Sequence, residues 1–204
     1  PRVNSRQSNG TSTRPVLPPI VVDDLDISFQ QPATAAAIRG AALQLTSGEG
    51  GRISARIEAR HGATMSVGDG QNGLDTVAAM VDLDGERLDL RELTGARGDG
   101  ALHASGSITL QGNASTVDVT VNGWSDLQSW WAATNDAAVP VGRVDATARV
   151  TGSVSDPAIA FEATCGSFAW SDVQVGDIRA RGSYRGGELS LNAATLRFAG
   201  GTVD

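Results

Sequence analysis

The sequence predicts an all-β fold, built as an extended and mostly antiparallel sheet. From Ile20 onward, apolar and polar residues alternate with period two, which is the pattern of strands with one apolar and one wet face. Turn sequences that contain glycine separate the alternating runs, as in hairpins. Hydrophobic residues make up 40% of the chain but aromatic residues only 4%, so the apolar face must consist mainly of Val, Leu, Ile and Ala.

The balance of charges and reactive residues excludes several classes of function. The 16 basic residues are all arginines and stand against 23 acidic residues, for a net charge of −7. A chain without a basic surplus is not expected to bind nucleic acid, because it cannot neutralise phosphates. One cysteine, Cys165, and two histidines, His61 and His103, offer no disulfide framework and no zinc site. We expect no enzyme, no cofactor and no bound metal.

The first 19 residues differ from the rest of the chain. They hold four of its seven prolines, with Ser, Asn, Thr and Arg between them, a composition typical of a linker or an extended leading segment. The chain begins with Pro1 instead of Met, and a strand is just starting where it ends at Asp204. We therefore expect an internal fragment of a longer protein, truncated at its C-terminus.

Residues 20–123 form the first predicted strand segment. Alternation is clearest over 101–110 and 116–122, where every second residue is apolar or glycine. Turn chemistry separates the runs, for example at 48–51 and at Asp84-Gly85. The pattern therefore predicts successive hairpins.

Residues 124–134 interrupt the alternation and predict a short amphipathic helix. Trp124, Leu127 and Trp131 fall at i, i+3 and i+7, and Ser125-x-x-Gln128 has the form of a capping box. The apolar stripe either plugs the core of the sheet or acts as a rim or gate, because Trp favours boundaries between apolar and wet surroundings.

Residues 135–204 form the second predicted strand segment. Alternation returns over 144–150 and 178–184, and residues 74–102 can be laid against 175–203 as a weak internal repeat. A repeat of this kind indicates an array that grows by adding strands.

The apolar face of these strands is the candidate functional surface. It is covered either by folding two sheets into a sandwich or by bending one sheet into a trough that receives an apolar ligand, and periodicity does not separate the two. In the trough, the groove would be lined by the larger apolar residues of this face: Leu102, Ile108, Leu110, Val117, Val119, Val121, Val144, Val150, Ile159, Phe161, Ile178, Leu189 and Leu191.

The C-terminal part carries a more specific pattern. Trp124-Ser-Asp-Leu127 precedes the run from Val141-Gly142 through Val150-Thr-Gly152 to Pro157-Ala-Ile159-Ala-Phe161, and then come Val173-Gln-Val175-Gly-Asp-Ile178, Gly187-Glu-Leu189-Ser-Leu191 and Ala199-Gly-Gly201-Thr-Val203. This succession resembles the repeat of the TamB family, inner-membrane subunits of the translocation and assembly module, within the wider AsmA-like group. The resemblance is good over residues 124–204 and moderate over 74–123, and over 1–73 it is limited to the general character of the sequence.

The resemblance implies a U-shaped, taco-like trough with an apolar interior. It implies a periplasmic segment of a protein anchored in the inner membrane, with the anchor outside these residues. The expected cargo is phospholipid acyl chains passing between inner and outer membrane, and an outer-membrane β-barrel assembly partner is expected as well. No catalytic residues are carried over.

Two other interpretations stay open. A β-solenoid adhesin or secreted passenger shares the glycine-rich, aromatic-poor composition, and a β-sandwich binding or scaffold module would need no lipid groove. A solenoid should show coils of about 20–25 residues with stacked identical side chains, whereas this chain shows unequal hairpins.

Overall fold

The computed structural model describes residues 18–31, 34–59, 61–67, 70–131, 139–198 and 201–203. They form one antiparallel sheet with strand order β14-β13-β12-β11-β10-β9-β8-β7-β6-β3-β2-β4-β5, and β1 pairs with β2. The strands are β1 (Ile20–Gln31), β2 (Thr34–Ser47), β3 (Ile53–Ala59), β4 (Ala63–Val67), β5 (Gly70–Leu74), β6 (Thr76–Asp84), β7 (Arg87–Arg97), β8 (Gly100–Thr109), β9 (Thr116–Asp126), β10 (Val141–Ser153), β11 (Asp156–Trp170), β12 (Val173–Arg185), β13 (Glu188–Phe198) and β14 (Gly201–Val203). Three short helical turns, η1 (Glu49–Gly51), η2 (Gly112–Ala114) and α1 (Leu127–Trp131), lie between strands.

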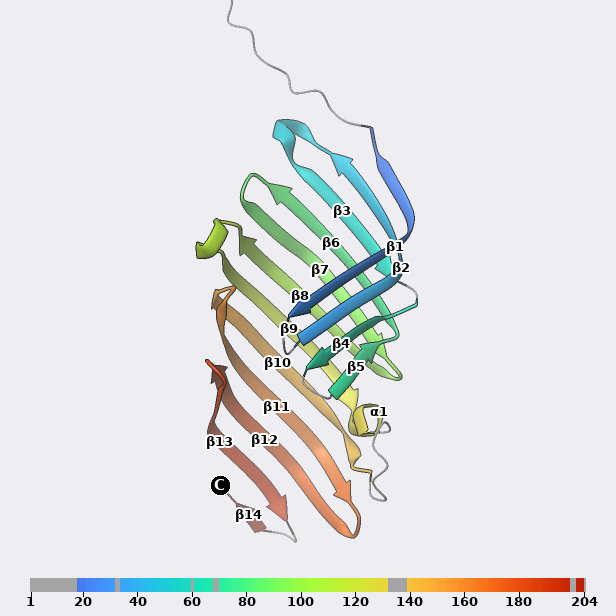
Figure 1. Ribbon diagram of the computed structural model, residues 1–204. Helices are drawn as coiled ribbons and strands as arrows, with labels where there is room; N and C mark the ends of the chain where they lie inside the picture. Colours follow the sequence, from blue (N-terminus) through green and yellow to red (C-terminus); the bar gives the residue numbers. More distant parts are fainter. Residues whose placement is uncertain are drawn as a thin grey trace, which may run out of the picture.

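Tight turns join most neighbouring strands, where the sequence predicts hairpins. Gly85 stands between β6 and β7 with φ +60°, a conformation that glycine adopts without steric cost. Because each strand pairs with the next one along the chain from β6 to β14, this part of the sheet is a simple meander of hairpins (Figure 1).

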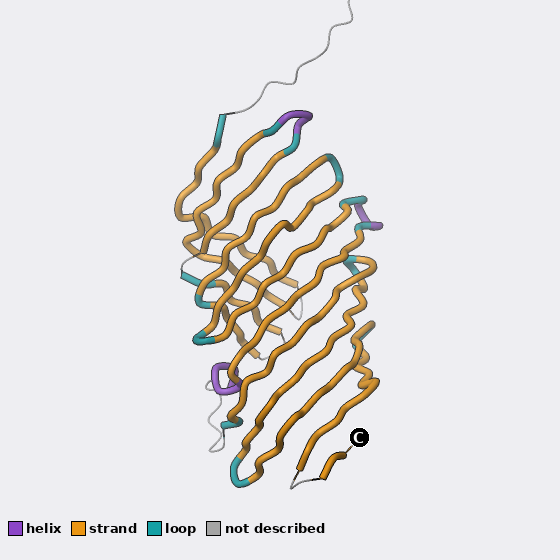
Figure 2. Tube along the Cα trace, turned by 180° about the vertical axis from the view of Figure 1, so that it is seen from behind, coloured by secondary structure: helices purple, strands orange, loops and turns teal. Residues whose placement is uncertain are grey.

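The N-terminal end of the sheet bends back over it. Gly40 has φ +59° in the middle of β2, and its amide donates a 2.9 Å hydrogen bond to the Asp26 carboxylate of β1. On one side of this bend, residues 41–47 pair with β3; on the other, residues 34–38 pair with β4. The bent halves of β1 and β2, together with β4 and β5, cross over the strands β6–β9 as a second layer (Figures 1 and 2).

The described residues hold few buried hydrophobic side chains, and a cluster of them lies at this bend. Ala41, Ala59 and Val77 are 0%, 1% and 7% exposed. Partly buried side chains pack around them, namely Leu25, Ile38, Ile57, Ala63, Leu74 and Leu93. The two layers therefore pack against each other at the bend. In the described part of the chain, strands β10–β13 form a single layer (Figure 2).

The predicted fold class is confirmed: the protein is an antiparallel, mostly β structure with an open, curled sheet and one short α-helix. Because the strand pairs of the described residues are antiparallel, the solenoid interpretation, which requires parallel coils, is wrong. Of the predicted leading segment 1–19, residues 1–17 lie outside the described residues.

The helix predicted over 124–134 is wrong at its beginning. Residues Trp124, Ser125 and Asp126 continue β9, because they pair with Asp145, Val144 and Arg143 of β10. Ladder hydrogen bonds of the sheet therefore take the place of the capping box, and α1 begins only at Leu127. Residues 132–134 of the predicted helix lie outside the described residues.

Candidate functional site

The residues predicted to line a groove lie on one face of the sheet. In an antiparallel pair, directly opposed residues point to the same face. Leu102 opposes Gly123, Ile108 opposes Val117, and Val119 opposes Val150, which in turn opposes Ile159. The same relation extends to the remaining strand residues of the set, namely Val121, Val144, Phe161, Ile178, Leu189 and Leu191. We call this surface the apolar face.

Leu110 is the exception among the predicted lining residues. It follows the end of β8 and is 42% exposed. Its amide donates a hydrogen bond of 2.6 Å to the carbonyl of Glu86, so the backbone continues the pairing by one residue although Leu110 is not part of the strand.

A row of mostly small side chains crosses the apolar face at right angles to the strands. Each member opposes the next across a strand pair, so the row runs along the length of the sheet. The row consists of Ala41, Ala59, Val77, Gly95, Leu102, Gly123, Ala146, Ala163, Ala180 and Ala194. With strands about 4.8 Å apart, this row is on the order of 40–45 Å long.

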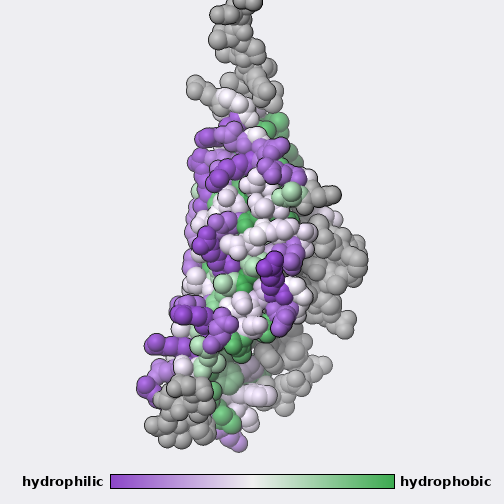
Figure 3. Space-filling model, turned by 90° about the vertical axis from the view of Figure 1, so that its left-hand side faces the viewer, coloured by the Kyte–Doolittle hydropathy of each residue, from purple (hydrophilic) through white to green (hydrophobic). Residues whose placement is uncertain are grey.

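Larger apolar side chains border the row along β8–β12. Val121, Phe161 and Ile159 lie further along the strands on one side, and Val144 and Ile178 lie on the other. The surface of the apolar face is therefore recessed along the row of small residues, because the side chains on either side of the row are larger. In the side view, hydrophobic residues (green) run between groups of hydrophilic residues (purple) (Figure 3).

The end of β5 lies close to the apolar face at Gly95. A Cβ atom added to Gly95 would lie 2.9 Å from Cδ1 of Leu74 in β5, so a larger residue here would displace the Leu74 side chain. A cavity of about 290 Å³ opens next to it. Its lining includes Leu74 from the second layer, Leu127 from α1, and Leu102, Gly123 and Val144 from the sheet.

Farther toward β13, the apolar face is open. Tyr184 is 41% exposed, Leu189 62% and Leu191 61%. Leu189 opposes Tyr184 and Leu191 opposes Gly182, so the exposed side chains belong to the same apolar face that is covered near β6–β9. Exposed aliphatic side chains that continue a partly covered apolar surface are typical of a surface that receives a ligand or partner.

The three residues predicted to form a rim or gate do not form one stripe. Trp124 opposes Ala101 and Asp145, which puts it on the opposite, polar face. Leu127 lies at the apolar cavity, and the lining of this cavity also includes Trp124. The side chain of Trp131 lies outside the described part of the structure. The predicted stripe is lost because residues 124–126 continue the strand, and successive strand residues point to alternate faces of the sheet.

The opposite face of the sheet carries the charges, and we call it the polar face. Ion pairs join neighbouring strands there: both nitrogens of the Arg149 guanidinium reach the two carboxylate oxygens of Asp118 at 3.0 Å, and Arg181 reaches Glu162 at 2.7 Å. These pairs are well exposed, so each contributes little to stability. Together they keep one face of the sheet wet.

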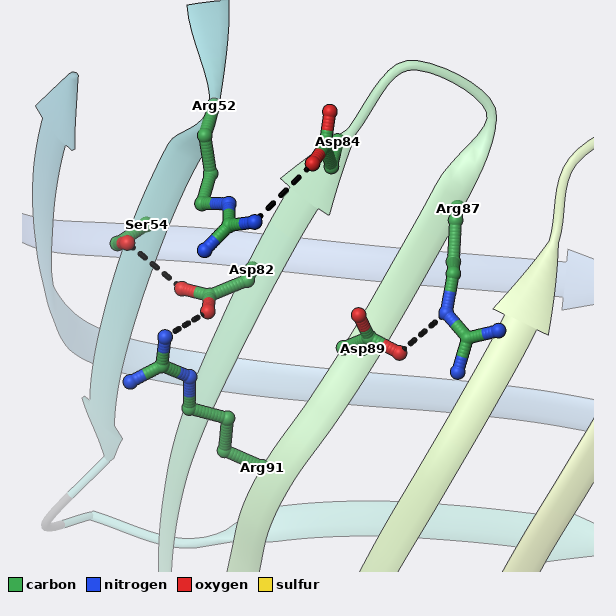
Figure 4. A network of polar contacts seen from close by, with 7 residues as sticks. All are labelled: Arg52, Ser54, Asp82, Asp84, Arg87, Asp89 and Arg91. Atoms are coloured by element: carbon green, nitrogen blue, oxygen red, sulfur yellow. Dashed lines mark hydrogen bonds and ion pairs between the residues drawn. The ribbon is translucent and has the colours of Figure 1, made fainter. Parts of the chain in front are cut away.

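A denser network lies on β3, β6 and β7 (Figure 4). Asp82 is 6% exposed, accepts a 2.6 Å hydrogen bond from the Ser54 hydroxyl, and pairs with Arg91. Arg52 and Asp84 pair at 3.2 Å beside it. The Ser54 hydrogen bond, with the Arg91 guanidinium, holds the pKa of the Asp82 carboxyl below its ordinary value. Asp82 is therefore an ionised, satisfied structural carboxylate.

The pKa values of Asp118 and Cys165 are shifted as well. The hydrogen bonds and charge of Arg149 lower the pKa of Asp118. Burial raises the pKa of the Cys165 thiol, which is 5% exposed and donates a hydrogen bond of 3.1 Å to the carbonyl of Ser167. Cys165 stands on the apolar face opposite Val144 and Ile178, so it acts as a small apolar side chain there.

The described residues were also compared with the requirements of a metal site and of a membrane-spanning helix by their composition and length. They hold no cluster of three or more His, Cys, Asp or Glu side chains suited to a metal ion. Among the same residues, no helix has the length and apolar character needed to cross a membrane.

The chain matches no protein-family model, no curated protein and no solved structure.

Proposed function

We propose that the apolar face binds phospholipid acyl chains and forms part of a path along which lipids pass. The observation that carries the proposal is the continuity of this face: one side of the sheet stays apolar strand after strand, is covered near β6–β9 and is open at β12 and β13. Leu189 and Leu191 extend this face as neighbouring exposed side chains, and a contiguous exposed apolar surface is typical of a binding site.

The expected free energy of acyl-chain binding suits a path along the sheet better than a single tight binding site. Each buried methylene group contributes about 0.8 kcal/mol, whether it lies in the bilayer or against the apolar face. Because the row of small residues changes little from Gly123 to Ala194, an acyl chain would find similar contacts at each strand. A flat profile of this kind allows movement along the row.

We further propose that the chain is a periplasmic segment of a TamB-like or AsmA-like protein, on the strength of the repeat pattern over 124–204. In that setting the lipid path would lead from the inner to the outer membrane. Support for the assembly of outer-membrane β-barrel proteins belongs to the same proposal and rests on the resemblance alone.

Site-specific photocrosslinking tests lipid binding. A photoreactive benzoylphenylalanine is placed at Leu189 or Leu191, and at the matched positions Ser190 and Asn192 of the same strand, which alternate with them. The full chain is expressed in bacteria, irradiated and examined by mass spectrometry for phospholipid adducts. A second set uses Val119 and Ile178, with Thr120 and Arg179 as controls.

Adducts at the apolar-face positions, and at few or none of the controls, would support the proposal. Equal labelling of both faces, or no lipid adduct at any position, would contradict it. The alternative is a sandwich or scaffold module, which is favoured by the packing of the second layer on Ala41, Ala59 and Val77. A negative crosslinking result would leave that alternative in place.

A further inference from the structure

A second cavity opens on the polar face of the sheet. Its volume is about 800 Å³, and it extends across the strands from β6 to β11. Two neighbouring rows of the polar face line it, together with four residues of the row that crosses the apolar face, Gly95, Leu102, Gly123 and Ala146. One contains Thr76, Ala96, Ala101, Trp124, Asp145 and Thr164, and the other contains Thr94, His103, Asn122, Thr147 and Glu162. We call it the polar groove.

The shape of the polar groove follows from small residues next to a large one. Ala96 opposes Ala101, and Ala101 opposes Trp124, so two methyl side chains on β7 and β8 leave a hollow beside the indole on β9. The guanidinium carbon of Arg143 lies 3.9 Å from the centre of the Trp124 ring. This contact holds the ring, and Arg143 is not one of the residues that line the groove.

The chemistry of the lining is that of uncharged hydrogen bonding. Thr94, Thr147 and Thr164 present hydroxyl groups, and Asn122 presents an amide. The Thr147 hydroxyl donates a 3.1 Å hydrogen bond to the Asn122 side-chain oxygen, which fixes these two side chains relative to each other. Donors and acceptors therefore stand next to an aromatic ring.

The charges at the polar groove are compensated inside the protein. Asp145 pairs with Arg143 at 3.2 Å, and Glu162 pairs with Arg181 at 2.7 Å. An anionic ligand would meet these carboxylates, and a cationic ligand would have to compete with arginines already in place. The charge balance fits a neutral ligand.

We propose that the polar groove binds an uncharged oligosaccharide, with Trp124 stacked on a sugar ring and Asn122 and Thr147 bonded to its polar groups. A sugar ring has C–H groups on its faces and hydroxyls at its edge, so it matches an indole bordered by threonines and an amide. In a chain with only 4% aromatic residues, this use explains an indole on the wet face of the sheet. The proposal does not depend on lipid binding, because the side chains that it invokes, Trp124, Asn122 and Thr147, lie on the polar face.

The test uses the full chain with two neutral probes, cellohexaose and N-acetylchitohexaose, and with hexagalacturonate as an anionic probe. Isothermal titration calorimetry gives the dissociation constants. We expect at least one neutral probe to bind and Trp124→Ala to weaken its binding about tenfold. The matched control is Trp170→Ala, which removes a 53% exposed tryptophan that is not part of the groove lining and should leave binding unchanged.

A second variant guards against misfolding of Trp124→Ala. Ala101→Leu adds a side chain into the hollow without removing any ligand-binding group, and circular dichroism checks that the strands are retained. Loss of binding in Ala101→Leu together with the Trp124→Ala effect would support the proposal. Three outcomes would overturn it: no binding of either neutral probe at millimolar concentration, binding that ignores both variants, or binding of hexagalacturonate alone.

Discussion

The Ser54 hydroxyl donates a 2.6 Å hydrogen bond to the carboxylate of Asp82, directly across the pair of strands β3 and β6. Asp82 is the buried acid of the described residues, at 6% exposure. A buried carboxylate must be compensated by hydrogen bonds or opposite charge, and Ser54 and Arg91 supply both. The link therefore ties the outer side of β3 to that of β6.

Substitution of Ser54 by Ala should destabilise the protein. The Asp82 carboxylate would lose a hydrogen bond in a place that water reaches poorly, so the free energy of unfolding should fall by about 1–2 kcal/mol. Urea denaturation followed by circular dichroism measures it. The control is Arg149→Gln, which breaks the exposed Asp118 pair and should shift the midpoint far less. Equal effects of the two substitutions would contradict this account.

The pH dependence of stability should report the same link. Because the pKa of Asp82 is lower in the folded protein than its ordinary value of 3.8, its stabilisation is fully present above that value and is lost as pH falls through the folded pKa. The stability difference between the wild type and Ser54→Ala should thus be constant between about pH 5 and 7 and shrink below about pH 4. Denaturation curves at several pH values check this. A difference that persists unchanged at the lowest pH would show that Ser54 acts by packing.

Gly182→Ala should destabilise β12. A Cβ atom at this position would lie 2.5 Å from the Ser190 carbonyl oxygen and 2.6 Å from Cζ of Phe161, so the backbone and the ring both have to move. We expect a loss of about 1–3 kcal/mol, measured by thermal unfolding. Gly166→Ala is the matched control, because nothing lies within 4 Å of a Cβ atom there. Adding Phe161→Leu to Gly182→Ala should cost less than the sum of the two. Strict additivity would mean that the ring is not the obstacle.

Cys165 should react slowly in the folded protein. The thiol is 5% exposed and burial raises its pKa, so little reactive thiolate is present at neutral pH. We expect labelling by Ellman's reagent to be roughly tenfold or more slower in native buffer than in guanidinium chloride. Because the chain has one cysteine, the absorbance reports this site alone. Rapid, complete labelling of folded protein would mean that the apolar face opens at β11.

Sequence alone determined which side chains share a face. Alternation at 101–110, 116–122 and 144–150 was sufficient, because the two-residue period of a strand puts every second side chain on the same side whatever the strand pairs with. Glycine at turns such as Gly85 determined where hairpins reverse. This alternation identified the residues predicted to line the groove. Leu110 is the exception, because β8 ends one residue before it.

Only the tertiary structure decided how far each strand runs and what covers it. Trp124 and Ser125 carry a helix signal, but Trp124 pairs with both β8 and β10 and Ser125 pairs with β10, which keeps both in β9. This pairing puts the indole on the polar face. The bend at Gly40 and the polar groove likewise depend on contacts between residues far apart in the chain. Local patterns fix the direction of a side chain, whereas the free energy that selects a strand end, a bend or a hollow comes from neighbours that the chain brings together only on folding.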